Sequence, residues 1–145
     1  MAENPFIGTW RLVSWEFRGA NGQVIYPFGQ DAHGYIMYNQ DGYMSVAIMK
    51  DGRPNYKSED FFAVSIEEKV SALETYYSYC GKYEICGDKV IHHVETSLLP
   101  NETGKDLERF YRFDGDRLFL IACSPFPLGG IEHTSYLIWE RNQRV

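Results

Sequence analysis

Turn signals divide this chain into short runs of β-branched and aromatic residues, and this pattern constrains the fold more than any other feature. Residues 40–42, 87–88 and 114–116 each contain Asp and Gly and join two such runs directly. Asp and Gly readily adopt the backbone conformations of tight turns, so each pair of flanking runs is predicted to form an antiparallel hairpin. The predicted strands, about nine in number, are residues 8–18, 24–26, 33–39, 43–49, 82–86, 89–98, 107–113, 117–123 and 134–140.

Sequential hairpins with short loops leave two closed architectures, an up-and-down barrel or a sandwich. A barrel is favoured because closure removes the unpaired strand edges through which aromatic-rich sheets aggregate. Aromatic residues make up 16% of the chain, and they suit both strands and the walls of an apolar cavity. We therefore predict an all-β, antiparallel up-and-down barrel of about 8–10 strands, with room inside for one small ligand.

One segment departs from this rhythm and has the spacing of an amphipathic helix. Ser65 is followed three residues later by Glu68, the pattern of a capping box at a helix N-terminus. A stripe of apolar residues recurs at helical spacing and consists of Ile66, Val70, Leu73 and Tyr77. The pattern predicts one helix over about residues 65–79. It either covers one end of the barrel or packs on the outside.

Length and charge exclude several classes of function. At 145 residues the chain has room for one core of ordinary size, so residues 1–145 are predicted to form a single domain. The formal net charge is −6 and Lys and Arg are not clustered, so we expect no nucleic-acid partner. The longest apolar run is far shorter than the roughly 20 residues that span a bilayer, so we expect no membrane association.

The N-terminal residues and the cysteines bear on the cellular compartment. Residues 1–5 lack the basic and apolar regions of a secretory signal, so a cytoplasmic location is expected. Cys80, Cys86 and Cys123 are odd in number and match no common zinc spacing, so we expect reduced thiols and no metal. No lysine or helix start follows Gly129-Gly130, and no G-x-S-x-G is present, so we expect no cofactor.

Both ends of the chain carry residues typical of one protein family. Gly8-Thr9-Trp10 opens the first run and Trp139-Glu140-Arg141 closes the last, a combination that resembles the lipocalin superfamily. The segments from Asn4 to Arg141 are similar to the bacterial and fungal lipocalin-like domain family of compact intracellular proteins. The segments that carry this resemblance are GTWRLVSWE, YPFGQDAHGYIMYNQDGYMSV, YCGKYEI, HHVETSLLPN and RFDGDRLFL.

The resemblance implies a calycin-type barrel with a cavity. In that superfamily the Trp closes one end of the barrel and the Arg lies across its ring. Trp10 and Arg141 are therefore expected to close this barrel through a cation–π contact of about 1 kcal/mol. The inserted helix and the lack of an export signal distinguish the chain from secreted lipocalins and argue against transport outside the cell.

The sharpest polar cluster is the run His92-His93-Val94-Glu95. Strand side chains alternate between the two faces, so His93 and Glu95 share one face while His92 shares the other with Val90 and Val94. If His93 and Glu95 face the lumen, they form a candidate general acid/base pair. A structural polar pair or an outward orientation is the alternative. The two imidazoles point in opposite directions, which argues against a shared metal ion.

Other residues are candidates for contact with a ligand. Arg109 and Arg112 fall on opposite faces of one predicted strand, and an inward-facing arginine could anchor an acidic head group. Tyr and Met side chains suit a pocket for apolar guests, although ordinary core packing is the alternative. The predicted ligand-binding residues are Tyr35, Met37, Tyr43, Ser45, Tyr83, His93, Glu95 and Arg112.

Three functions remain open from the sequence. The first is binding of a small apolar or amphipathic molecule in the barrel cavity. The second is an isomerase or cyclase acting on a polyketide- or terpenoid-like intermediate, with His93 and Glu95 as catalytic residues. The third is a structural or partner-binding domain whose lumen is filled by its own side chains. Whether the chain is an enzyme is undecided, and a homodimer is one oligomeric state that the sequence leaves open.

Overall fold

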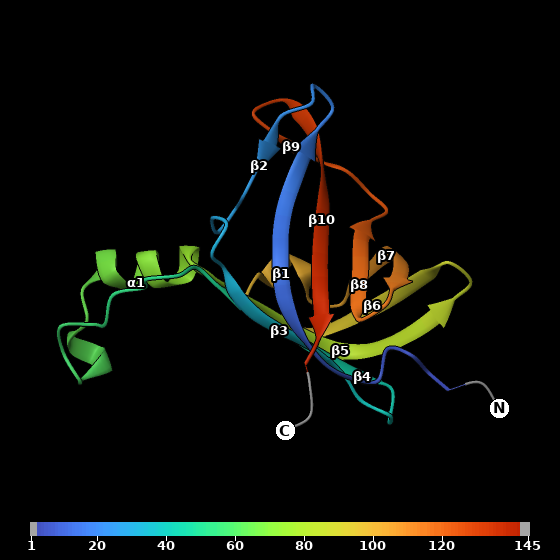
Figure 1. Ribbon diagram of the computed structural model, residues 1–145. Helices are drawn as coiled ribbons and strands as arrows, with labels where there is room; N and C mark the ends of the chain where they lie inside the picture. The colour runs from blue at the N-terminus through green and yellow to red at the C-terminus, as the bar shows by residue number, and fades with distance from the viewer. Residues whose placement is uncertain (1–2, 143–145) are drawn as a thin grey trace.

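A computed structural model describes residues 3–142 (Figure 1). Each predicted strand overlaps a strand of the structure. In chain order the elements are β1 (Gly8–Gly19), β2 (Val24–Ile25), β3 (His33–Tyr38), β4 (Tyr43–Met49), the 3-10 helix η1 (Phe61–Ala63), α1 (Ile66–Glu74), β5 (Tyr76–Cys86), β6 (Lys89–Ser97), the 3-10 helix η2 (Pro100–Glu102), β7 (Asp106–Asp114), β8 (Arg117–Ala122), β9 (Phe126–Leu128) and β10 (Ile131–Arg141).

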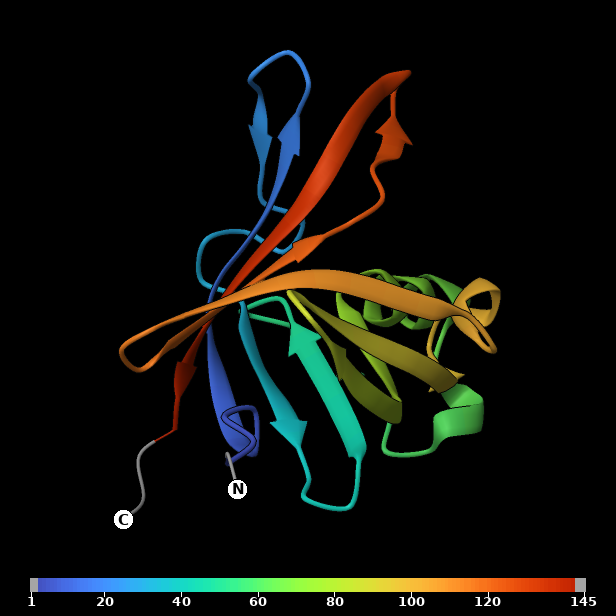
Figure 2. The same ribbon diagram turned by 90° about the vertical axis from the view of Figure 1, so that its right-hand side faces the viewer.

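The strands form one antiparallel sheet that closes on itself. Its order is β1-β3-β4-β5-β6-β7-β8-β10, and β10 pairs back onto β1 to complete the barrel. Two short strands lie outside this ring, β2 against β1 and β9 against β10. They extend the barrel wall at one end, where the two hairpins rise above the remaining strands (Figure 2). The predicted all-β, antiparallel up-and-down barrel is confirmed.

Side-chain alternation places the core inside the ring. On β3, Ile36 and Tyr38 are buried whereas Tyr35 and Met37 are exposed. Ile36 lies opposite Val46 of β4, which is also buried, so the two strands present matching inner faces. A shift of one residue in either strand would turn the apolar side chains of that strand toward solvent, so this register is strongly favoured.

The segment before β1 closes one end of the barrel. Phe6 is completely buried and its backbone carbonyl accepts a hydrogen bond from Trp10 Nε1 at 2.9 Å. The Phe6 ring packs edge-on, with centroid distances of 4.9–5.1 Å, against Tyr38, Tyr111 and Phe113. Such pairs add about 0.5–1.5 kcal/mol each beyond their buried area. This end is therefore filled with aromatic side chains.

Arg141 lies over Trp10 at this closed end, as the family resemblance led us to expect. Its guanidinium carbon is 4.2 Å from the centroid of the Trp10 ring. The same guanidinium donates to the carbonyl oxygens of Ile7 and Pro5, at 3.0 and 2.7 Å. Arg141 therefore connects the last strand to the segment that precedes the first.

The helix is shorter than predicted. Its start is as expected, because the Ser65 hydroxyl accepts from the Glu68 N–H at 3.2 Å and the Glu68 carboxylate accepts from the Ser65 N–H. The predicted end at Tyr79 is wrong, since β5 begins at Tyr76 and its first residues pair with β4. Pairing satisfies the backbone groups of β4, which would otherwise form an open edge, and so outweighs the local helical spacing.

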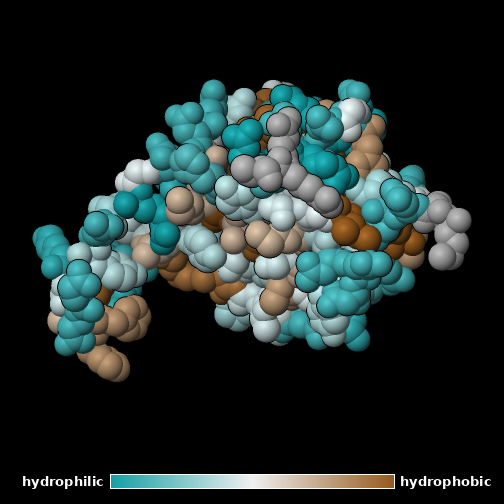
Figure 3. All heavy atoms as spheres, turned by 60° about the horizontal axis from the view of Figure 1, so that its bottom comes forward, coloured by the Kyte–Doolittle hydropathy of each residue, from teal (hydrophilic) through white to brown (hydrophobic). Residues whose placement is uncertain are grey.

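α1 lies outside the barrel and projects from its side (Figure 1). Arg53 holds its C-terminal end by donating to the Ala72 carbonyl and the Thr75 hydroxyl, both at 3.0 Å. The predicted apolar stripe faces solvent at Ile66 and Val70. α1 and η1 together form an arm, and apolar side chains are also exposed at its tip (Figure 3).

Three further features of the fold bear on the predictions. Phe126–Leu128, predicted to be part of a rim loop, forms β9 at the sheet edge, where Pro127 is tolerated because edge strands need fewer N–H donors. Cys80, Cys86 and Cys123 form no disulfide in the part of the chain that the structure describes. None of the helices described in residues 3–142 has the length and apolar character needed to cross a bilayer.

Candidate ligand cavity

The other half of the barrel encloses a cavity of about 620 Å³. This volume is within the range of about 300–1,000 Å³ that is typical of small-molecule sites. The cavity reaches the surface beside Leu73, Leu99 and Pro125, which lie at the end of α1 and on two loops. Its walls are mostly apolar side chains directed inward, among them Trp15, Phe17, Phe28, Ile36, Val46, Ile48, Leu107, Leu120, Leu137 and Trp139.

A buried histidine in the cavity wall lies between two tyrosine hydroxyls. His92 of β6 is 1% exposed, its Nε2 is 2.7 Å from the Tyr38 hydroxyl, and its Nδ1 is 2.6 Å from the Tyr79 hydroxyl. Burial, aided by the positive charge of Arg109, holds the pKa of His92 well below its ordinary value of 6.5. The imidazole is therefore neutral at physiological pH and has one donor and one acceptor nitrogen.

Arg109 brings a positive charge to the same wall. It lies on β7 opposite Ala122 of β8, and both residues line the cavity. Its Nη1 donates to the Glu108 carbonyl at 3.3 Å, and within residues 3–142 Arg109 forms no ion pair. Burial raises the pKa of Tyr79 to about 12, and Arg109 opposes this rise. The Tyr79 hydroxyl is thus protonated and lies near a cation.

A second polar group lies nearer the surface. Glu102 of η2 accepts hydrogen bonds from the Tyr77 hydroxyl at 2.6 Å and from the Ser97 hydroxyl at 3.1 Å. Burial, the neighbouring Tyr79 and the Glu102 carboxylate raise the pKa of Tyr77, so its hydroxyl remains a donor. The cavity lining therefore contains acidic groups, Glu74 and Glu102, as well as the basic Arg109, and the Glu102 carboxylate is already hydrogen-bonded to its neighbours.

Most of the predicted ligand-binding residues lie outside the barrel. Tyr35, on β3, is 46% exposed. The side chains that face outward and do not line the cavity are those of Tyr35, Met37, Tyr43, Ser45, His93, Glu95 and Arg112. Tyr83 points inward but belongs to the closed end, where its hydroxyl donates to the Asn39 carbonyl at 2.8 Å. None of the eight predicted ligand-binding residues therefore lines this cavity.

The sequence left the orientation of these strands open because both of their faces carry apolar residues. Alternation separates two sets of side chains but does not say which set is inside. On β6 a signal was present: Val90 and Val94 share a face with His92, whereas Lys89 and Glu95 lie on the face of His93. The apolar set is buried and takes His92 with it. The candidate pair His93 and Glu95 therefore does not reach the cavity.

Sequence reasoning missed most of the polar residues of the cavity for the same reason. His92 and Arg109 lie on strand faces whose orientation the sequence left open, and neither is among the predicted ligand-binding residues. Tyr38 and Tyr79 carried a usable signal, since each shares a strand face with other buried residues of β3 or β5. Glu102 carried none, because η2 lies in a loop whose position depends on the folded barrel.

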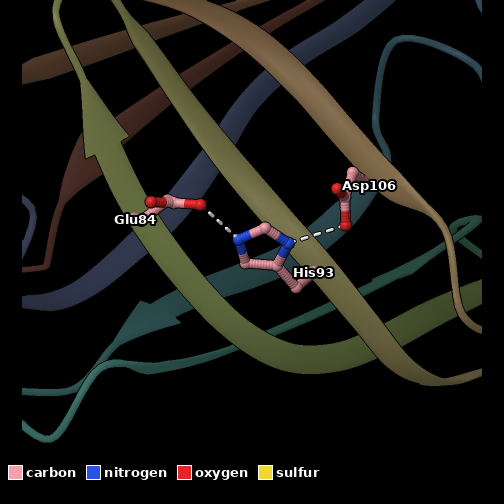
Figure 4. A network of polar contacts seen from close by, with 3 residues as sticks. All are labelled: Glu84, His93 and Asp106. Carbon is pink, nitrogen blue, oxygen red and sulfur yellow. Dashed lines mark hydrogen bonds and ion pairs between the residues drawn. The ribbon is translucent and has the colours of Figure 1, made fainter.

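His93 has a different environment on the outer face (Figure 4). Its Nδ1 is 2.6 Å from Asp106 of β7 and its Nε2 is 2.7 Å from Glu84 of β5. Hydrogen bonds to Asp106 and then to Glu84 raise the pKa of His93 above its ordinary value of 6.5. When it is protonated, the imidazole joins three strands through two carboxylates.

We expect this cluster to make stability depend on pH. The pKa of His93 is higher in the folded than in the unfolded state, so its contribution is complete below about pH 6.5 and disappears as the pH rises through the raised pKa. The side chain is 34% exposed, so solvent screening limits the effect to under about 1 kcal/mol. Urea denaturation of the natural protein from pH 5 to about 9 should show a loss of unfolding free energy that is absent in His93→Gln. Parallel curves for the two proteins would contradict this account.

Comparisons with known proteins agree with this architecture. A family model for the lipocalin-like domain matches residues 7–142. The 4'-hydroxy-3'-methoxypropiophenone carrier protein ppsC of Aspergillus oryzae is 32% identical over 110 residues, which cover 70% of this chain and 99% of that protein.

Two solved structures were also matched. A lipocalin-like protein from Bacteroides uniformis has 10% identity and a TM-score of 0.48, with 96% of this chain and 100% of that chain covered. An uncharacterized protein from Bacteroides eggerthii has 11% identity and a TM-score of 0.48, with 94% and 99% covered. From the family match over nearly all of its length and from its relationship to the Aspergillus oryzae carrier, the chain belongs to the lipocalin-like domain family.

Proposed function

We propose that this protein binds a small aromatic ketone with a phenolic hydroxyl in the barrel cavity and serves as its carrier. The observation that carries the proposal is a cavity of about 620 Å³ with aromatic walls and a few inward-facing polar groups. A barrel with a purely structural role would fill this space with its own side chains, as the closed end does around Phe6. The ligand class is taken from the relative that is named as a carrier of such a compound.

The energetics favour a ligand that is both aromatic and polar. Burying one aromatic ring removes about 150–250 Å² from water, which contributes roughly 4–6 kcal/mol before the cost of association. Micromolar affinity requires about 8 kcal/mol. The remainder must come from further contacts, and His92, Tyr79, Arg109 and Glu102 are among the polar groups that line the cavity.

Binding is tested by calorimetric titration with 4'-hydroxy-3'-methoxypropiophenone. We expect a dissociation constant on the order of micromolar for the natural sequence. Ala122→Trp should weaken binding at least tenfold, because Ala122 lines the cavity beside Arg109 and the larger side chain occupies ligand space. Stability should change little, since the new ring enters a cavity and not a packed core.

Ile121→Trp is the matched control, because Ile121 is adjacent on β8 but faces outward. It should bind as the natural protein does. Absence of binding heat with the natural protein at millimolar ligand would refute the proposed function. Equal affinity of Ala122→Trp and the natural protein would refute the cavity as its location.

A further inference from the structure

Hydrogen-bond accounting at His92 leaves one tyrosine proton without an acceptor. A neutral imidazole donates through one nitrogen and accepts through the other. With hydroxyls 2.7 and 2.6 Å from its two nitrogens, one tyrosine donates to His92 and the other accepts from it. The tyrosine that accepts must direct its own O–H elsewhere.

Burial decides which tyrosine this is. Tyr38 is 1% exposed, does not line the cavity, and has His92 as its hydrogen-bond partner within residues 3–142. Tyr79 lines the cavity. A buried hydroxyl proton without an acceptor costs about 1–3 kcal/mol. The favourable arrangement therefore has Tyr38 donating to Nε2 and His92 Nδ1–H donating to Tyr79, whose O–H then points toward the cavity.

Arg109 supplies the second donor group. Its side chain lines the same cavity as Tyr79, and among the residues described no carboxylate pairs with it. Of the cavity carboxylates, Glu102 already accepts hydrogen bonds from Tyr77 and Ser97. A guanidinium beside mostly apolar walls, with no counter-ion, favours an anionic ligand oxygen over a neutral one.

We propose that Arg109 and Tyr79 form a two-donor site that binds the ionised phenolic oxygen of an aromatic ketone. This inference rests on the proposed function and specifies which form of the ligand is carried. A hydroxyl conjugated through the ring to a ketone is an acidic phenol, so its anion is accessible near neutral pH. Arg109 compensates its charge and the Tyr79 O–H donates to the same oxygen.

The test compares 4'-hydroxy-3'-methoxypropiophenone with its 4'-methyl ether, which keeps the ketone but cannot ionise. The phenolate absorbs at longer wavelength than the phenol, so the ionisation of the bound ligand is measured directly by absorbance. With the natural protein, the bound phenol should ionise at a pH lower than the free phenol by at least about one unit, as is typical beside a cation. The phenol should also bind more tightly than the ether.

Variants then assign the effect to the two side chains. Arg109→Met should weaken binding of the phenol at least tenfold, abolish the absorbance shift and leave binding of the ether unchanged. Arg109→Lys retains the charge and should keep part of the shift. Tyr79→Phe should reduce the absorbance shift less than Arg109→Met does. Arg112→Met is the matched control, since Arg112 lies on the same strand but faces outward.

The outcomes separate this inference from the proposed function. If neither compound binds the natural protein, the proposed function fails. If both compounds bind and Arg109→Met weakens binding of the phenol and the ether equally, or weakens neither, the carrier function stands and the anion site is overturned. A red-shifted bound phenol that loses its shift in folded Arg109→Met, with Arg112→Met unaffected, supports the site.

Discussion

Replacement of His92 by phenylalanine is expected to lower the free energy of unfolding by about 2–4 kcal/mol. The phenyl ring fills a similar volume but removes the ring nitrogens that face Tyr38 and Tyr79 at 2.7 and 2.6 Å. The Tyr38 hydroxyl, at 1% exposure, then has no access to water, and burial without a partner costs about 1–3 kcal/mol. Urea denaturation at neutral pH measures the difference.

A triple variant separates this cause from simple loss of packing. In Tyr38→Phe/His92→Phe/Tyr79→Phe no polar group is left unpaired, so we expect the triple variant to recover a large part of the loss, although it carries more substitutions. His93→Phe, on the outer face of the same strand, should cost much less than His92→Phe. A triple variant that is less stable than the single one would show that the hydroxyls are not the cause.

Gly81→Ala is expected to destabilise the barrel by more than about 3 kcal/mol, or to prevent folding. Gly81 is buried at a bulge, where Cys80 pairs with Thr96 and Gly81 with Val94, so that one residue of β6 is left over. A Cβ on Gly81 would collide with the backbone carbonyl oxygen of His93 across the ladder and lie 2.9 Å from the amide nitrogen of Glu95. Backbone atoms of a paired strand cannot rotate away.

The neighbouring residue provides the control. Cys80→Ala removes a side chain that is not fully buried, whose sulfur contacts the Thr96 hydroxyl, and it should cost under about 1 kcal/mol. Thermal unfolding followed by circular dichroism compares the two proteins. A Gly81→Ala protein that melts within a few degrees of Cys80→Ala would show that β5 and β6 separate more easily than this packing implies.

Hairpins were predictable because their determinants are local. Asp41-Gly42 precedes β4 at the predicted residue, and the structure has φ of 90° at Gly42, a backbone conformation that glycine adopts readily. The helix start at Ser65 was predictable for the same reason, since its capping box involves residues three apart. The helix end was not predictable locally. Tyr77 continues the predicted apolar stripe, and it belongs to a strand because it pairs with Ile48 of β4.

The polar site shows the same division between local and long-range determinants. Alternation paired His93 with Glu95 and separated both from His92, and that separation holds in the structure. Which of these two faces of β6 points into the barrel depends on the whole closed ring of strands. His92 is inside because Val90 and Val94 must be buried there, and its partners come from two other strands, Tyr79 from the preceding β5 and Tyr38 from the more distant β3.

The hairpin order, the start of the helix and the contact between Trp10 and Arg141 at one end of the barrel could be predicted from the sequence. These depend on turn chemistry, on capping or on a recognisable pair of residues. The side of each strand that faces the cavity is established only in the closed barrel. The barrel places Arg109, and not Arg112, in the cavity wall. The physical reason is that a strand has two chemically similar faces here, and burial of one of them is a property of the closed ring and not of any single strand.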